Sequence, residues 1–264
     1  MPGLPLNPAA PDLWLGHAIL NGRSAHHRVE PMEGTLSIKT VRSGKGVWET
    51  PDGRYEVTPD TSLILNQGQS YSLEIDSPTE TLCLFFRPAF VSGGFYERLR
   101  LLTPELRATL HQLRFLAGQG GTETERDETI LRAATLIRAE ESGPQEEARL
   151  EHASPAVREE VFRSLNRARD YALGNLGARL ALDDLAAVAC MSPFHFHRLH
   201  RQAFGETPHR FVTRARLARA KRLLRAGSDV GAVSLALGFE SLPTFTRLFK
   251  THTGQTPGAF RKIG

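Results

Sequence analysis

The chain has 264 residues, with 33 lysine and arginine residues, 29 aspartate and glutamate residues, and two cysteines. This length suffices for one large or two modest domains. Two cysteines are too few for a disulfide framework, a four-cysteine zinc site or an iron–sulfur cluster. No apolar run approaches the roughly 18 residues of a membrane span, and residues 1–11 lack the basic and apolar regions of a signal peptide. We therefore expect a soluble, cytoplasmic protein with no segment inserted in a membrane.

The charge is divided unevenly along the sequence. Residues 1–153 contain 15 basic and 21 acidic side chains, a net charge of −6. Residues 154–264 contain 18 basic and 8 acidic side chains, a net charge of +10. Such asymmetry indicates a polyanionic partner for the C-terminal part alone, with nucleic acid as the first candidate and a membrane surface as the second.

Residues 35–87 have the pattern of short antiparallel strands. Thr35–Val41 and Tyr71–Ile75 alternate apolar and polar side chains, which is typical of half-buried strands. Ser62–Leu65 and Thr81–Phe86 are denser apolar runs, which suit strands covered on both faces. Glycine, proline and aspartate separate these runs at short intervals, so the pattern predicts a small β sandwich or barrel.

After Pro88 the pattern becomes helical. Thr103 and Pro104 suit the N-cap and first position of a helix, whose leucine stripe continues to about residue 117. A second helix is expected from about Thr124 to Glu141, and the charged stretch 142–154 is expected to be a linker.

The predicted fold class is α+β. Residues 1–95 are expected to form a strand-rich domain, and residues 96–153 a helical hairpin and linker. Residues 154–264 are expected to form an all-α domain.

The C-terminal part contains an internal repeat. Residues 194–211 align with residues 243–260, and the matched positions include Phe196 with Phe245 and Arg198 with Arg247. The repeat indicates that one supersecondary unit is used twice.

A short helix and a tight turn are expected before each copy. Leu182–Ala189 is followed by the turn Cys190–Ser192, and Asp229–Leu237 is followed by the turn Gly238–Leu242. A short helix, a turn and a longer basic helix predict a helix-turn-helix unit, whose second helix can enter the major groove.

Helical spacing divides the second helix of each unit into an inner and an outer face. The residues expected to face inward are Phe196, Leu199, His200 and Ala203 in the first unit, and Phe245, Leu248 and Phe249 in the second. The residues expected to reach DNA are His195, His197, Arg198, Arg201, Gln202, Thr244, Thr246, Arg247 and Lys250. Arg198 and Arg247 share one repeat position and are expected to contact guanine edges.

A long basic helix is predicted from Pro208 to Ala226, between the two units. At about 1.5 Å per residue it spans roughly 30 Å, close to the roughly 34 Å between successive major-groove turns. A single chain is therefore expected to contact two adjacent grooves. Arg214 and Arg222 of this helix are expected to contact phosphates, which adds salt-dependent affinity.

The C-terminal part, from about Phe162 to Lys262, resembles the AraC/XylS family of bacterial transcription regulators. The segments that carry the resemblance are Leu185–Pro193, Phe204–Pro208, Ala236–Ser241, Phe245–Lys250 and Gly254–Pro257. The resemblance implies two helix-turn-helix units joined by a long helix. It also implies base contacts from Phe194, His197, Arg198, Leu242, Pro243, Thr246 and Arg247.

For the N-terminal half, the resemblance implies a cupin-like barrel that binds a small effector, with dimerisation through a helix in residues 96–153. The expected protein is a homodimeric regulator of transcription, activator or repressor, that binds double-stranded DNA and has no enzymatic activity and no cofactor. A small-molecule effector, with no residues assigned to it, and RNA polymerase are its further candidate partners.

Two alternatives concern the N-terminal half. It could be a protein-interaction or dimerisation module without an effector. It could also be an enzyme domain fused to a DNA-targeting module, as in alkyl-transfer repair proteins that resemble this family. Those enzymes need an N-terminal cysteine cluster that holds zinc, whereas this half contains Cys83 alone. Cys83 suits a buried strand, and Cys190 suits a tight turn.

No metal site is expected in the chain. His195 and His197, two residues apart, point to different helix faces, and His200 aligns with the core residue Phe249. The pair His26-His27, even with His17, lacks the alternate-strand spacing of cupin metal ligands.

Overall fold

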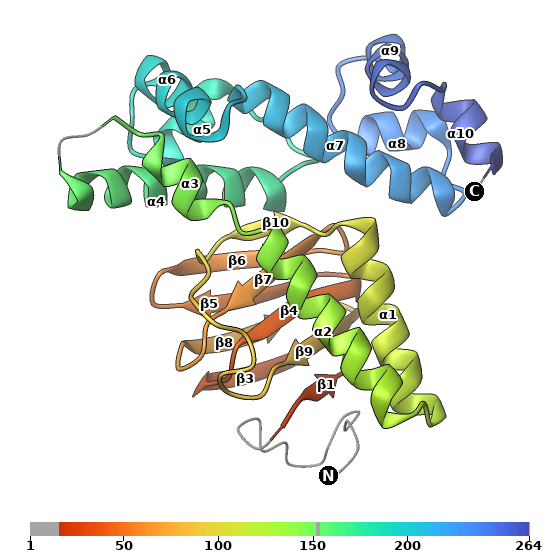
Figure 1. Ribbon diagram of the computed structural model, residues 1–264. Coiled ribbons are helices and arrows are strands. Elements are labelled where there is room, and N and C mark those ends of the chain that lie inside the picture. Colours follow the sequence, from red (N-terminus) through yellow and green to blue (C-terminus); the bar gives the residue numbers. More distant parts are fainter. Residues whose placement is uncertain (1–15, 152–153, 264) are drawn as a thin grey trace. The chain divides into compact units, whose positions relative to one another are not determined.

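The computed structural model describes residues 16–151 and 154–263 and divides into two compact units, Met1–Gln145 and Glu146–Gly264 (Figure 1). The first unit is an antiparallel β domain with helices, and the second is helical. The predicted α+β class is therefore confirmed at this level. The domain boundary was predicted between residues 153 and 154. Residue 153 lies outside the described residues.

Two antiparallel sheets form the β domain. One sheet has the strand order β1-β9-β4-β7-β10, with β2 also paired to β9. Its strands are β1 (Ala18–Leu20), β2 (Arg23–Ser24), β4 (Ser37–Ser43), β7 (Thr61–Leu65), β9 (Thr79–Phe85) and β10 (Leu99–Leu101). The other sheet has the order β3-β8-β5-β6, with strands β3 (His27–Glu33), β5 (Gly46–Thr50), β6 (Gly53–Val57) and β8 (Ser70–Ile75).

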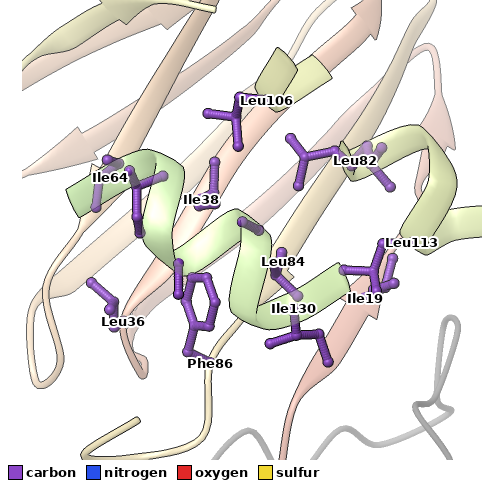
Figure 2. Close-up of a cluster of buried hydrophobic side chains, with 14 of the residues drawn as sticks. Ile19, Leu36, Ile38, Ile64, Leu82, Leu84, Phe86, Leu106, Leu113 and Ile130 are labelled. Carbon is purple, nitrogen blue, oxygen red and sulfur yellow. The ribbon is translucent and has the colours of Figure 1, made fainter. Parts of the chain in front are cut away.

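Helices α1 (Pro104–Gln119) and α2 (Glu123–Ala139) cover the outer face of the β4-β7-β9 sheet. Figure 2 shows the apolar side chains that meet there. The helices contribute Leu106, Leu110, Leu113, Ile130, Ala133, Ala134 and Ile137, and the sheet side contributes Ile19, Leu36, Ile38, Ile64, Leu82, Leu84 and Phe86. Both helices begin at threonine caps: Thr103, as predicted, accepts from the backbone N–H of Leu106, and Thr122 forms a capping box with Glu125.

Strand β4 differs from the prediction. Its alternating sequence predicts one buried and one solvent-facing side, yet Ser37–Val41 is buried throughout. The physical reason is that Ile38 faces the helices, whereas Lys39 on the opposite face reaches Tyr71 of the second sheet. The polar face of β4 therefore lies between the two sheets.

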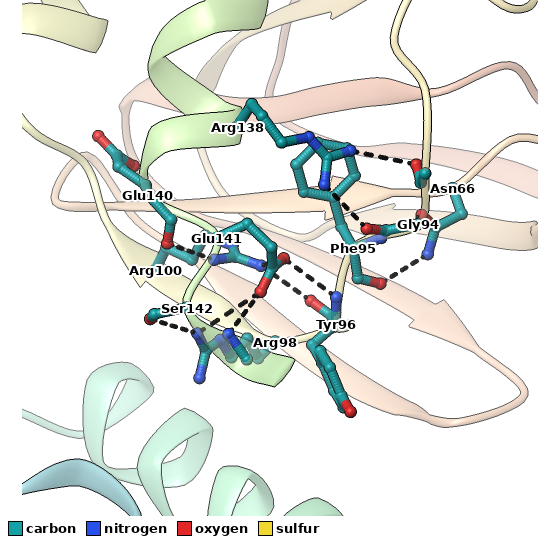
Figure 3. A network of polar contacts seen from close by, with 12 residues as sticks. Asn66, Gly94, Phe95, Tyr96, Arg98, Arg100, Arg138, Glu140, Glu141 and Ser142 are labelled. Carbon is teal, nitrogen blue, oxygen red and sulfur yellow. Dashed lines mark hydrogen bonds and ion pairs between the residues drawn. The ribbon is translucent and has the colours of Figure 1, made fainter. Parts of the chain in front are cut away.

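The region after Pro88 is not purely helical, because β10 pairs with β7 before α1 begins. A three-residue strand has too few positions to show a period, which explains why the pattern missed it. Polar contacts fix β10 and its flanks to the end of α2 (Figure 3). The guanidinium of Arg100 lies 2.6 Å from the Glu141 carboxylate, and both side chains are buried. Arg100 also donates to the backbone oxygens of Tyr96 and Glu140.

The second unit consists of helices around α7. Their bounds are α4 (Pro155–Gly174), α5 (Leu182–Val188), α6 (Pro193–Phe204), α7 (Pro208–Arg225), α8 (Val230–Ala236), α9 (Leu242–Thr253) and α10 (Pro257–Ile263). Along the sequence, the boundary between the two units falls within α3 (Gly143–Ala148). One core cluster joins Leu217, Ala220 and Leu224 of α7 to Val233, Leu237, Phe245 and Phe249. Over the described residues, none of the helices has the length and apolar character needed to cross a bilayer.

Candidate nucleic-acid interface

The first helical pair, α5 and α6, is joined by a Schellman turn. The backbone N–H of Met191 donates to Ala186 O at 2.9 Å, and that of Cys190 donates to Ala187 O at 3.0 Å. Cys190 adopts the left-handed conformation, with φ of 56°. Ser192 then caps α6 by accepting from His195 N–H at 3.3 Å.

The second helical pair, α8 and α9, repeats this geometry. The backbone N–H of Phe239 donates to Ser234 O at 3.2 Å, and Gly238 takes the left-handed position with φ of 63°. Ser241 caps α9 by accepting from Thr244 N–H at 3.3 Å. The two pairs therefore share their turn and cap chemistry, although the second turn is one residue longer.

The predicted inner faces are largely confirmed. Phe196, Leu199, His200 and Ala203 are the buried residues of α6. In α9, Phe245 and Phe249 are buried, whereas Leu248 is only partly buried. This difference follows from the surroundings, because α6 packs against α4, α5 and α7, whereas the main contacts of α9 are with α8 and α10.

The side chains predicted to contact DNA all remain accessible. Phe194, Arg198, Arg201, Leu242, Pro243, Arg247 and Lys250 are exposed, and His195, His197, Gln202, Thr244 and Thr246 are partly exposed. Phe194 is 81% exposed, an unusual state for a large apolar side chain. Within the described part of the chain, no ion pair engages Arg198, Arg247 or Lys250. The Nη2 atom of Arg198 lies 3.4 Å from Nδ1 of His195.

The arginines of α7 have different surroundings. Arg214, predicted to contact phosphate, pairs with the Glu206 carboxylate at 2.7 Å, with 44% of its side chain exposed. Arg222, the other predicted phosphate contact, is partly exposed.

Arg216 is a structural residue that the sequence did not single out. It donates to the backbone oxygens of Leu176 at 3.0 Å, Ala178 at 2.7 Å and Gly238 at 3.1 Å. Burial lowers the pKa of its guanidinium. Arg216 thus joins the segment before α5 to the turn of the second pair, and no sequence signal distinguishes it from the other arginines of α7.

His200 is buried among aromatic rings in the first pair. Its ring centroid lies 4.7 Å from that of Phe204 and 5.7 Å from that of Phe196, and its Nδ1 donates to Glu206 O at 2.8 Å. Burial, aided by the charge of Arg169, lowers the pKa of His200 to about 3, so the ring is neutral at pH 7.

The other histidines considered above as metal ligands lie in different parts of the structure. His195 and His197 remain partly exposed on α6, and His17 packs against the rings of Phe86 and Phe90. Across residues 16–151 and 154–263, no group of three or more His, Cys, Asp and Glu residues is placed to hold a metal ion.

The capped helices, their tight turns and the basic outer surface define the C-terminal unit as a helix-turn-helix DNA-binding domain. A family model described as a helix-turn-helix domain matches residues 185–263. The chain belongs to the AraC/XylS family of transcription regulators, as its motifs indicate.

Relatives and a solved structure match about a third of the chain. The bifunctional transcriptional activator/DNA repair enzyme AdaA of Bacillus subtilis is 33% identical over 95 residues, which cover 36% of this chain and 45% of AdaA. The transcriptional activator NphR of a Rhodococcus species is 40% identical over 86 residues, 32% of this chain and 25% of NphR. A solved AraC-type transcriptional regulator from Chromobacterium violaceum is 30% identical with a TM-score of 0.36, and the match covers 38% of this chain and 89% of that one. The chain thus spans less than half the length of these two sequence relatives.

Proposed function

We propose that this protein is a sequence-specific regulator of transcription in which both helical pairs act as helix-turn-helix units on double-stranded DNA. The observation that carries the proposal is the repetition of a capped helix with an exposed outer face, on which Arg198 and Arg247 hold the same position. The connecting helix α7 has 18 residues and spans about 27 Å. This length suits two recognition helices, α6 and α9, in successive major-groove turns of one DNA face.

The proposed contacts divide into two kinds. Base edges would be contacted from α6 and α9, with the guanidinium groups of Arg198 and Arg247 placed to donate two hydrogen bonds to guanine. Phosphates would be contacted by Arg214 and Arg222 of α7, contacts that position the protein without adding sequence information. The residues to which we assign DNA contacts are Phe194, His195, His197, Arg198, Arg201 and Gln202 of α6, and Leu242, Pro243, Thr244, Thr246, Arg247 and Lys250 of α9.

We assign the N-terminal unit the role of an effector and dimerisation domain with a cupin-like arrangement of its sheets. Two exposed apolar side chains support dimerisation through the helices: Phe115 of α1 is 62% exposed, and Leu131 of α2 is 58% exposed. A ligand or a change of dimer contact would then control how the second unit meets DNA and RNA polymerase. DNA as the target is consistent with a cytoplasmic location.

The enzymatic alternative has less support. Alkyl-transfer repair chemistry of the kind considered above needs a cluster of cysteines, whereas this half contains Cys83 alone. Cys83 is buried between the sheets, and burial raises the pKa of its thiol, which opposes formation of a nucleophilic thiolate. We therefore assign the N-terminal unit a binding role rather than a catalytic one.

Footprinting of the full chain on DNA from upstream of its own gene tests the proposed function. We expect protection of two neighbouring major-groove segments about 10 base pairs apart, and steep loss of affinity as salt increases. A shuffled duplex of the same composition is the control. Equal affinity for both duplexes would contradict sequence-specific regulation.

A further inference from the structure

The stretch predicted to be a linker, residues 142–154, folds in part onto the helical unit. Leu150 is buried, and its backbone N–H donates to the Glu147 oxygen at 2.9 Å. The carboxylate of Glu147 pairs with Arg158 of α4 at 3.2 Å. These residues all belong to the second compact unit. The segment Glu147–Leu150 is therefore part of that unit's fold rather than a free connection.

The side chain of Arg149, within this segment, reaches the last turn of α6. Its Nη1 donates to the backbone oxygen of Ala203 at 3.1 Å. Because α6 ends at Phe204, this oxygen is one of the four carbonyl groups that have no partner within the helix. A positive charge at the C-terminal end of a helix is also favoured by the helix dipole. Arg149 thus stabilises this helix end by a hydrogen bond and by its charge.

The guanidinium of Arg149 has no competing acidic partner. Over residues 16–151 and 154–263, no carboxylate forms an ion pair with it. The residue is exposed, yet its hydrogen bond joins two positions that are 54 residues apart in the sequence. Fixing a long side chain in this way costs conformational entropy, which the contact with α6 offsets.

The second helical pair lacks this contact. In the internal repeat, Ala203 of α6 corresponds to His252 of α9. Among the described residues, no side chain donates a hydrogen bond to the backbone oxygen of His252. Arg149 also precedes residues 185–263, which the helix-turn-helix model matches. The end of α6 is thus held by a part of the chain that has no counterpart in the repeat.

We propose that Arg149 is a positioning residue for DNA recognition, which holds the C-terminal end of α6 in the orientation in which Arg198 reaches base edges. This inference deepens the DNA-binding function proposed above and rests on it. With 12 residues, α6 is about 18 Å long. A tilt of about 10° around its C-terminal end would move its first turn by about 3 Å, which is more than a hydrogen bond tolerates.

A direct contact with a DNA phosphate is the other role that an exposed arginine can have in such a protein. A phosphate contact would strengthen binding to every duplex and increase the salt dependence of the affinity. A positioning role affects only the part of the affinity that depends on base contacts. The two roles therefore predict different results for a duplex without the recognised sequence.

Fluorescence anisotropy of the full chain on the footprinted duplex and on a shuffled duplex tests the role. Arg149→Met keeps the length of the side chain but donates no hydrogen bond, so it should weaken binding to the footprinted duplex by about tenfold. Binding to the shuffled duplex, and the salt dependence on both duplexes, should stay unchanged. Arg149→Lys retains a donor and the charge and should recover most of the loss. The matched control is Arg163→Met, at an exposed arginine of α4 that pairs with Glu159, and it should have no effect.

A double-mutant cycle tests whether the effect of Arg149 passes through α6. Combined with Arg198→Ala, Arg149→Met should add little further loss on the footprinted duplex, because the base contact that it positions is already absent. Combined with Arg247→Ala of α9, it should add its full loss of about tenfold. Full additivity in both combinations would overturn the inference, and so would equal losses on the footprinted and shuffled duplexes.

Urea denaturation of the same variants measures the stability of the fold separately. A partly unfolded variant binds both duplexes less well in the same proportion, so the ratio of the two affinities remains the measure of positioning. An unchanged ratio for Arg149→Met, in a chain whose parent distinguishes the two duplexes, overturns only this inference. A parent chain that binds both duplexes equally overturns the proposed function and the inference that rests on it.

Discussion

The two helical pairs of the C-terminal unit are built from the same local elements but have different cores. Both have a Schellman turn, a serine cap before the second helix and an arginine at the same outer position. At equivalent inner positions, however, α6 has His200 and α9 has Phe249, and both are buried. The comparison shows that turn and cap chemistry determines the geometry that the two pairs share. The core residues determine how the stability of each pair depends on pH.

The two turns also differ at one position, the residue in the left-handed conformation. Each needs one residue in the left-handed conformation, which Gly238 adopts without strain and Cys190 adopts at a cost. Gly238 is also confined: a Cβ there would lie 3.0 Å from Gly177 O and 3.1 Å from Ala178 O. A side chain in the second turn would therefore require the surrounding atoms to move, whereas the first turn already carries one.

Gly238→Ala should have the largest effect on stability. It adds left-handed strain and contacts that the backbone around it cannot relieve, so we expect a loss of about 3 kcal/mol in the free energy of unfolding. Gly227→Ala is the matched control, because Gly227 also has a positive φ but nothing lies within 4 Å of its Cβ position. Urea denaturation should show a loss of only about 1 kcal/mol for the control. Equal losses would mean that packing around Gly238 has no role.

Arg198→Ala and Arg247→Ala test whether the two pairs contribute equally to DNA recognition. Each should weaken binding to the specific site by about 1–3 kcal/mol and spare binding to a shuffled duplex, because the lost contacts are to bases. Fluorescence anisotropy on both duplexes measures the difference. Arg163→Ala, at an exposed arginine of α4 paired with Glu159, is the control. An effect of only one of the two substitutions would show that the pairs do not act alike.

Acid should destabilise the first pair more than the second through His200. The folded pKa of about 3 lies below the ordinary value of 6.5, so the unfolded chain binds the proton first as pH falls. The resulting loss begins near pH 6.5, grows as the pH falls towards 3, and reaches about 2 kcal/mol at pH 5. His200→Phe, which copies Phe249, should flatten the dependence of unfolding free energy on pH between 7 and 5. An unchanged slope would contradict the assignment.

Cys190→Gly should have the smallest effect, a gain of stability of about 1 kcal/mol or less. Glycine removes the left-handed strain, but it also increases the freedom of the unfolded chain. Cys190→Ala is the control, because it keeps the Cβ and should leave stability nearly unchanged. If thermal unfolding shows no gain for glycine over alanine, the first turn stores no strain.

The sequence was most informative where local chemistry repeats. The cap at Thr103, the inner face of α6 and the tight turns follow from residue types a few positions apart, and these appear as predicted. The polar face of β4 did not follow, because alternation shows that a strand has two faces but not what covers each one. Lys39 was therefore expected at solvent and lies between the sheets. Strand β10 and the role of Arg216 depend on partners distant in sequence, which a local pattern does not contain.

The contacts of Arg216 have a consequence for the kind of DNA sequence this protein would accept. One guanidinium fastens the loop that leads into the first pair and the turn of the second pair to the middle of α7. Movement of one pair relative to the other would break the hydrogen bonds that Arg216 donates to Leu176 and Ala178 or the one that it donates to Gly238. The two halves of the target would then have to lie at one fixed spacing, and a single inserted base pair, which also rotates one half around the DNA axis, would cost far more affinity than a single mismatch.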